Sequence, residues 1–106
     1  MTEPYIHLAN TSDIPEGEVR IFDYEDFSIA ICHTKEGYFA VENVCTHDDG
    51  PLGEGCLEGF AIECPRHGAK FDVRDGKVLQ MPAAFPIRTF ETRLEGDQIL
   101  VKVERS

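Results

Sequence analysis

The chain has 106 residues, and its 10 lysines and arginines against 20 aspartates and glutamates give a formal net charge of −10. This length is typical of one domain, and we expect a single domain over residues 1–106. Nucleic acids and anionic membranes would repel so acidic a chain, so neither is expected as a partner. Basic protein surfaces would attract it.

The elements expected in chain order are short strands joined by turns. Alternating apolar and polar residues predict strands over 5–8, 19–24, 27–32, 38–41, 71–73, 77–79, 87–94 and 99–103, with a hairpin over 57–63. Irregular segments rich in Gly, Pro, Cys or His are expected at 11–17, 43–55, 64–68 and 81–86. Because no stretch has a useful helical period, the chain is predicted to be all-β, a small antiparallel sandwich or barrel.

The cysteines point to metal binding in a reducing compartment. Residues 1–5 lack the basic and apolar regions of a secretory signal, and no apolar run approaches the ~18–20 residues of a membrane span. We therefore expect a cytoplasmic location without a membrane partner. Clustered Cys and His in such a compartment bind metal more often than they form disulfides.

Two of the irregular segments contain closely spaced metal-binding side chains. Cys45 and His47 lie in the first, and Cys64 and His67 lie in the second. Two thiolates and two imidazoles suit either tetrahedral zinc or an iron–sulfur centre. Structural zinc fingers usually place like ligands together, whereas here each segment is mixed, C-x-H and then C-x₂-H. The spacing favours an iron–sulfur centre, with structural zinc as the open alternative.

The two mixed segments resemble the ligand loops of Rieske proteins. The resemblance implies one [2Fe–2S] cluster, in which Cys45 and Cys64 bind one iron while His47 and His67 bind the other, more exposed iron. It covers nearly the whole chain and implies a Rieske-like fold. In that fold a cluster-binding subdomain at about 43–86 holds the two ligand loops, and the proline segment 81–86 covers them.

Departures from the high-potential members of that family are informative. Those proteins join their loops by a disulfide, where this chain has Gly50 and Arg66, and they carry Ser and Tyr hydroxyls where it has Ala69 and Phe71. Because fewer donors reach the cluster sulfurs, we expect a potential near the lower end of the Rieske range of about −150 to +300 mV. This pattern resembles the soluble Rieske ferredoxins of bacterial multicomponent aromatic-ring dioxygenases.

That resemblance implies an electron carrier rather than an enzyme. It would pass single electrons from an NAD(P)H-dependent flavin reductase to a terminal Rieske non-haem iron oxygenase, and we expect it to be a monomer. Two other classes stay open: a Rieske-fold small subunit of a nitrite reductase or another redox enzyme, and a structural zinc module that binds a protein.

Four further Cys and His residues lie outside the ligand segments. Cys32 and Cys56 are expected to be buried or loop thiols without a ligand role. His7 and His33 are expected to be surface or hairpin residues.

Overall fold

The computed structural model describes residues 5–44, 50–65, 68–81 and 85–103. Of the four expected ligands, Cys64 lies in these ranges, whereas Cys45, His47 and His67 lie outside the described residues. The strands are β1 (Tyr5–Asn10), β2 (Val19–Tyr24), β3 (Phe27–Thr34), β4 (Gly37–Glu42), β5 (Cys56–Glu58), β6 (Ala61–Glu63), β7 (Lys70–Asp72), β8 (Val78–Gln80), β9 (Thr89–Phe90), β10 (Thr92–Glu95) and β11 (Gln98–Lys102). Two short 3₁₀ helices, η1 (Thr11–Asp13) and η2 (Leu52–Glu54), complete the described elements.

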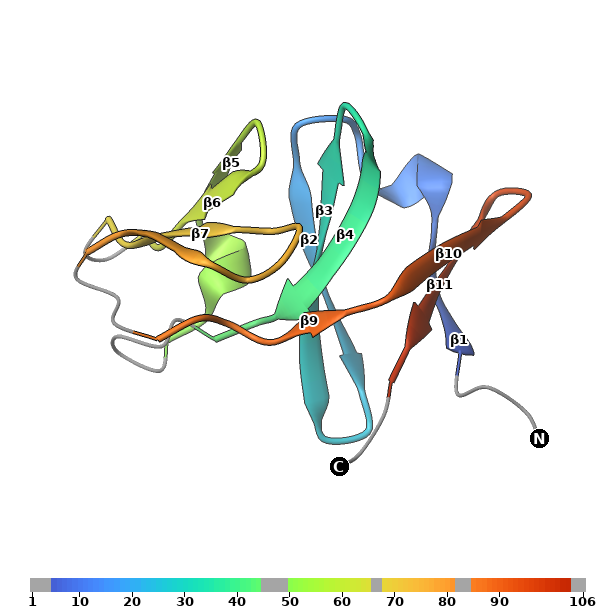
Figure 1. Ribbon diagram of the computed structural model, residues 1–106. Coiled ribbons are helices and arrows are strands. Elements are labelled where there is room, and N and C mark those ends of the chain that lie inside the picture. The colour runs from blue at the N-terminus through green and yellow to red at the C-terminus, as the bar shows by residue number, and fades with distance from the viewer. Residues whose placement is uncertain (1–4, 45–49, 66–67, 82–84, 104–106) are drawn as a thin grey trace.

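The strands form three sheets in which the pairs are antiparallel. Their orders are β1-β11-β10, β2-β3-β4-β9 and β5-β6-β7-β8. The β2–β4 strands stand in the middle of the molecule, with β5–β7 on one side and β1, β10 and β11 on the other (Figure 1). The prediction of an all-β antiparallel fold is therefore confirmed.

Most expected strands are present with small shifts at their ends, but one prediction is wrong. The stretch 87–94 was expected to form one strand, and it forms β9 and β10 with a break at Glu91. Before the break, Phe90 pairs with Ala40 of the central sheet, whereas Thr92 pairs with Val101 of the three-stranded sheet. The chain changes sheets at Glu91, and alternation of side chains does not reveal which sheet a strand joins.

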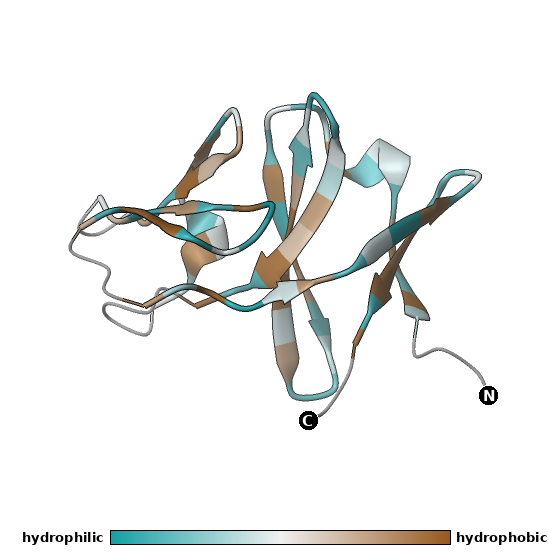
Figure 2. Cartoon of the chain, in the orientation of Figure 1, coloured by the Kyte–Doolittle hydropathy of each residue, from teal (hydrophilic) through white to brown (hydrophobic). Residues whose placement is uncertain are grey.

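Strand β3 is buried on both faces, because its two faces serve two different hydrophobic cores. Ile29 and Ile31 belong to a core shared with the β1-β11-β10 sheet, which also contains Ile14, Ile99 and Val101. Ala30 and Cys32 belong to a second core, formed with Val41, Leu52, Ile62, Cys64, Ala69, Phe71, Val73 and Ile87. Figure 2 shows hydrophobic residues in the central strands and in the strands on both sides of them. The second core supports the candidate site.

Within the described ranges, no helix has the length and apolar character needed to cross a membrane.

Candidate metal centre

The first expected ligand segment is tied together by the side chain of Asn43. Its Oδ1 accepts a hydrogen bond from the backbone N–H of Gly53 at 2.6 Å, and its Nδ2 donates to the Ser28 hydroxyl at 3.0 Å. The Asn43 backbone N–H also donates to the Ser28 carbonyl oxygen at 2.9 Å. Asn43 therefore joins the start of the segment to its far end and fixes both to β3. Asn43 is not among the residues predicted for the site, although Asn before an irregular stretch is a turn signal.

The far end of the first segment packs directly against the start of the second. A side chain at Gly55 would collide with the backbone carbonyl of Glu63 and would come within 3.2 Å of the Pro65 ring. Only glycine permits this approach of the two backbones. Strand pairing continues the contact, because Cys56 lies opposite Glu63. The described parts of the two segments are thus neighbours, as a shared metal centre requires.

Cys64 follows β6 and is the one expected ligand that the structure describes. Cys64 is 1% exposed and belongs to the core beneath the site. Its backbone N–H donates to the Ala69 carbonyl at 2.7 Å, and its own carbonyl accepts from the Gly68 N–H at 3.2 Å. Gly68 has φ +76°, a left-handed conformation that suits glycine. These bonds join Cys64 to Gly68 and Ala69 across the second ligand segment.

The third segment, expected at 81–86, starts and ends at fixed points. Before it, Gln80 donates from Nε2 to the Gly68 carbonyl at 3.0 Å. After it, the Ile87 N–H donates to the Gly76 carbonyl at 3.0 Å, and the Arg88 carbonyl accepts from the Glu42 N–H at 2.8 Å. The ends of the segment are therefore anchored on the second ligand loop, the β7–β8 turn and β4.

The β7–β8 turn that receives the third segment is held by an ion pair. The Asp72 carboxylate, in a residue only 8% exposed, accepts hydrogen bonds from Arg74 Nε at 3.0 Å and Nη2 at 2.8 Å. These bonds hold the pKa of Asp72 below its ordinary value, although burial opposes them. The guanidinium also lies 4.1 Å from the centre of the Phe60 ring. The turn is thus joined to the β5–β6 hairpin.

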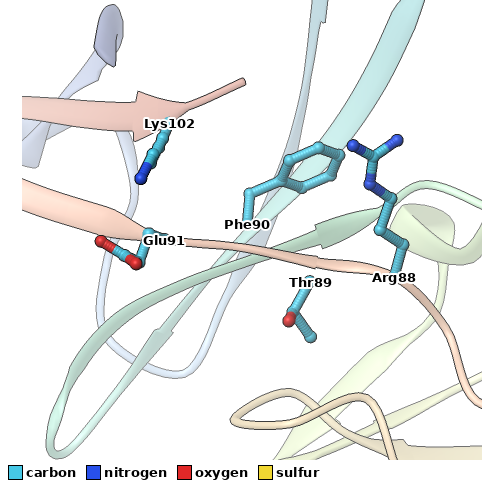
Figure 3. A pocket seen from close by; sticks show the side chains of 5 residues that line it. All are labelled: Arg88, Thr89, Phe90, Glu91 and Lys102. Carbon is cyan, nitrogen blue, oxygen red and sulfur yellow. The ribbon is translucent and has the colours of Figure 1, made fainter. Parts of the chain in front are cut away.

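A surface hollow of about 310 Å³ lies elsewhere, at β9 and β11. Its lining side chains are Arg88, Thr89, Phe90, Glu91 and Lys102 (Figure 3). The Arg88 guanidinium lies 5.0 Å from the centre of the Phe90 ring, and Glu91 accepts a 2.6 Å hydrogen bond from the Tyr5 hydroxyl. Since this lining offers neither thiolate nor imidazole, the hollow is not a candidate for the metal centre.

The Cys and His residues outside the ligand segments have local explanations. Cys32 is fully buried, which raises the pKa of its thiol to about 12, and Cys56 is an exposed thiol at the start of β5. His7 is exposed and donates from Nε2 to Asn10 Oδ1 at 2.8 Å. His33 is half-buried, donates from Nδ1 to the Ile14 carbonyl at 2.7 Å and stacks on Tyr38. Cys32 is buried and His7 lies on the surface, as expected, whereas Cys56 lies at the start of a strand instead of in a loop, and His33 has a structural role.

Among the residues that the structure describes, no three His, Cys, Asp or Glu side chains lie together in a way that could hold a metal ion. Cys45, His47 and His67 lie outside these residues.

Comparison with known proteins decides the family. Residues 5–91 match the Rieske [2Fe-2S] domain. This chain belongs to the Rieske family. Its cofactor is accordingly one [2Fe–2S] cluster of the Rieske type. The matched range contains both ligand segments and the proline segment.

Curated relatives of this Rieske chain are ferredoxin components of oxygenase systems. It is 40% identical over 97 residues to the ferredoxin component of biphenyl 2,3-dioxygenase from Rhodococcus jostii (strain RHA1), covering 92% of this chain and 91% of the relative. It is 36% identical over 104 residues to the ferredoxin component of the naphthalene 1,2-dioxygenase/salicylate 5-hydroxylase systems of a Ralstonia species, covering 98% of this chain and 100% of the relative.

Solved structures agree with this Rieske fold. The ferredoxin of carbazole 1,9a-dioxygenase from Nocardioides aromaticivorans IC177 matches with a TM-score of 0.90 at 26% identity, covering 94% of this chain and 98% of that one. A chain in a complex of reduced oxygenase and oxidized ferredoxin in carbazole 1,9a-dioxygenase matches with a TM-score of 0.90 at 28% identity, covering 99% and 98%. A putative nitrite reductase small subunit shares the fold alone, at 15% identity.

The described residues fit such a cluster. Thiolates are ligands of iron–sulfur clusters, and Cys64 supplies a buried thiol directly after β6. The first segment reaches the same place through the packing of Gly55 against Glu63. Ala69 and Phe71, both fully buried, offer no hydroxyl to a cluster sulfur from this loop.

Proposed function

We propose that this chain is the electron-carrying ferredoxin of a multicomponent oxygenase that acts on aromatic compounds. The observation that carries the proposal is near full-length similarity to ferredoxin components of biphenyl and naphthalene dioxygenase systems. When bound, a Rieske cluster supplies one-electron transfer. The proposed donor is an NAD(P)H-dependent flavin reductase, and the proposed acceptor is a terminal Rieske non-haem iron oxygenase.

The proposed ligands are Cys45 and Cys64 on one iron and His47 and His67 on the other. Support comes from the mixed spacing of the two segments, from the burial of Cys64, and from the contact between the segments at Gly55. The absence of hydroxyls at positions 69 and 71 favours a potential near the lower end of the Rieske range.

Reconstituted electron transfer tests the function. The purified chain is mixed with the flavin reductase and terminal oxygenase of a biphenyl or naphthalene system, and oxidation of NADH and formation of dihydrodiol are followed. We expect both to depend on this chain. A colourless protein with stoichiometric zinc, or a red-brown one that no oxygenase system oxidises, would overturn the proposal.

Replacement of one proposed ligand tests the site. His47→Ala should abolish the visible bands of the cluster and the EPR signal of the reduced protein, because one iron loses a ligand. His7→Ala is the matched control, since His7 is exposed and bonds only to Asn10 among the contacts described. Unchanged spectra in the His47 variant would remove it from the ligand set.

A monomeric state and a cytoplasmic location complete the proposal. Sedimentation of the oxidised protein and fractionation of the source cells test these two points. The nitrite reductase alternative has weaker support, because that likeness extends only to the fold.

A further inference from the structure

The described residues at the two ends of the third segment differ in their exposure to solvent. The Met81 side chain is 81% exposed and that of Phe85 is 68% exposed, so their apolar surfaces face solvent instead of packing on the core. The end at Ile87 is well fixed, because this side chain is 4% exposed and its N–H bonds to Gly76. The start of the segment depends on what precedes Met81.

Gln80 precedes it, and a β-bulge sets its position. Phe71 pairs with Val78, but Lys70 pairs with Gln80, so Leu79 is an extra residue in β8. A bulge of this kind re-aims the side chains that follow it. Gln80 Nε2 consequently reaches the Gly68 carbonyl, at 3.0 Å, across the edge of the second ligand loop.

Gly68 has a conformation and hydrogen bonds that a substitution would disturb. It follows the proposed ligand His67, it adopts φ +76°, and its N–H bonds to the carbonyl of Cys64. Its N–H thus closes the loop from one side while its carbonyl accepts the Gln80 amide from the other. Among the described residues, this side-chain hydrogen bond adds to the pairing of Gln80 with Lys70 in holding the end of the loop against β8.

We propose that Gln80 is a positioning residue of the cluster site. Its amide fixes the backbone of Gly68, the residue after the proposed ligand His67, relative to β8. The inference rests on the proposed ligand roles of Cys64 and His67. A neutral amide suits the task, because it donates a hydrogen bond to a carbonyl without adding charge beside the site.

Gln80→Met tests the inference, because methionine has a similar length but donates no hydrogen bond. In the holoprotein we expect amide hydrogen exchange in 68–71 and 85–88 to rise about 5-fold, as the loss of one ordinary hydrogen bond implies. Loss of the visible bands to a chelator should accelerate by a similar factor. The EPR line shape of the reduced cluster should change, because the loop that carries a proposed ligand relaxes.

Two further variants complete the design. Gln98→Met places the same substitution on exposed β11, in the other sheet, and should match the wild type in every measurement. Gln80→Lys retains a nitrogen donor and should restore slow exchange. If Gln80→Met exchanges and loses its cluster at wild-type rates, or if Gln80→Lys behaves as Gln80→Met does, the inference is wrong. A colourless wild-type protein would instead overturn the proposed function, while the exchange data would still test the Gln80 contact.

Discussion

At the scale of single residues, two polar side chains hold the segments of the candidate site against one another. Asn43 closes the first ligand segment on Gly53, and Gln80 joins the second to the third. Neither could be predicted from the sequence, because each bonds to a backbone group 10 or 12 positions away and carries no spacing signature. The Cys and His ligand pairs were predictable for the opposite reason, since their spacing within each segment is local.

The described cysteines should differ sharply in reactivity. Burial raises the pKa of the Cys32 thiol, which keeps the thiol protonated, and the side chain is inaccessible to reagents. Cys56 is exposed. Brief treatment of the holoprotein with iodoacetamide should therefore alkylate Cys56 first and Cys32 only after unfolding, as peptide mass spectrometry would show.

The Cys56→Ser variant provides the control for this experiment and should show no rapid alkylation. Rapid labelling of Cys32 in the folded holoprotein would contradict the described burial.

At the scale of secondary-structure elements, hairpins and their turns set how the strands lie beside the candidate site. Local alternation predicted β2 at its observed bounds and predicted the β5–β6 hairpin, because such pairs are close in sequence. The break at Glu91 was not predictable, because it depends on which distant strand each half meets. In the β7–β8 turn, Gly76 both adopts φ +81° and accepts the Ile87 N–H. This turn therefore supports the return of the third segment.

Two glycines in turns separate the cost of a left-handed backbone conformation from the cost of a steric clash. Gly96, in the β10–β11 turn, has φ +59° and open space where a Cβ would lie, so Gly96→Ala should lower the free energy of unfolding by about 1 kcal/mol. A Cβ at Gly76 would also collide with the Ile87 carbonyl oxygen, so Gly76→Ala should cost about 2–3 kcal/mol. Denaturant unfolding followed by circular dichroism would measure both, and equal losses would contradict the packing at Gly76.

At the scale of the whole molecule, exposed apolar side chains and net charge determine what kind of surface a partner meets. Three of the five large apolar side chains exposed in the described chain, Leu79, Met81 and Phe85, belong to β8 and the third segment. The other two are Ile21 and Leu94. A net charge of −10 would attract a basic partner over long range, and close contact would then favour an apolar surface that loses water easily. Leu79, Met81 and Phe85 offer such a surface near the end of the second ligand segment.

Leu79 and Leu94 allow a test with equal exposure, at 50% and 51%. If partners dock beside the ligand loops, Leu79→Ser should raise the KM of the oxygenase or reductase for this chain about tenfold, since a buried apolar contact is lost. Its kcat and visible spectrum should not change. Leu94→Ser, on β10 in the other outer sheet, should leave KM unaltered. Equal effects of the two substitutions would contradict docking at this end of the molecule.

Strand β3 is shared between the two hydrophobic cores of the molecule. The face of β3 that carries Ala30 and Cys32 belongs to the core under the candidate site, whereas the face that carries Ile29 and Ile31 belongs to the other core. A graft of residues 43–86 from a relative would therefore have to match the Ala30 and Cys32 face of this strand together with Val41 and Ile87. The other core contains no described residue of that segment, so Ile29 and Ile31 would keep their contacts while the segment that carries the proposed ligands changes.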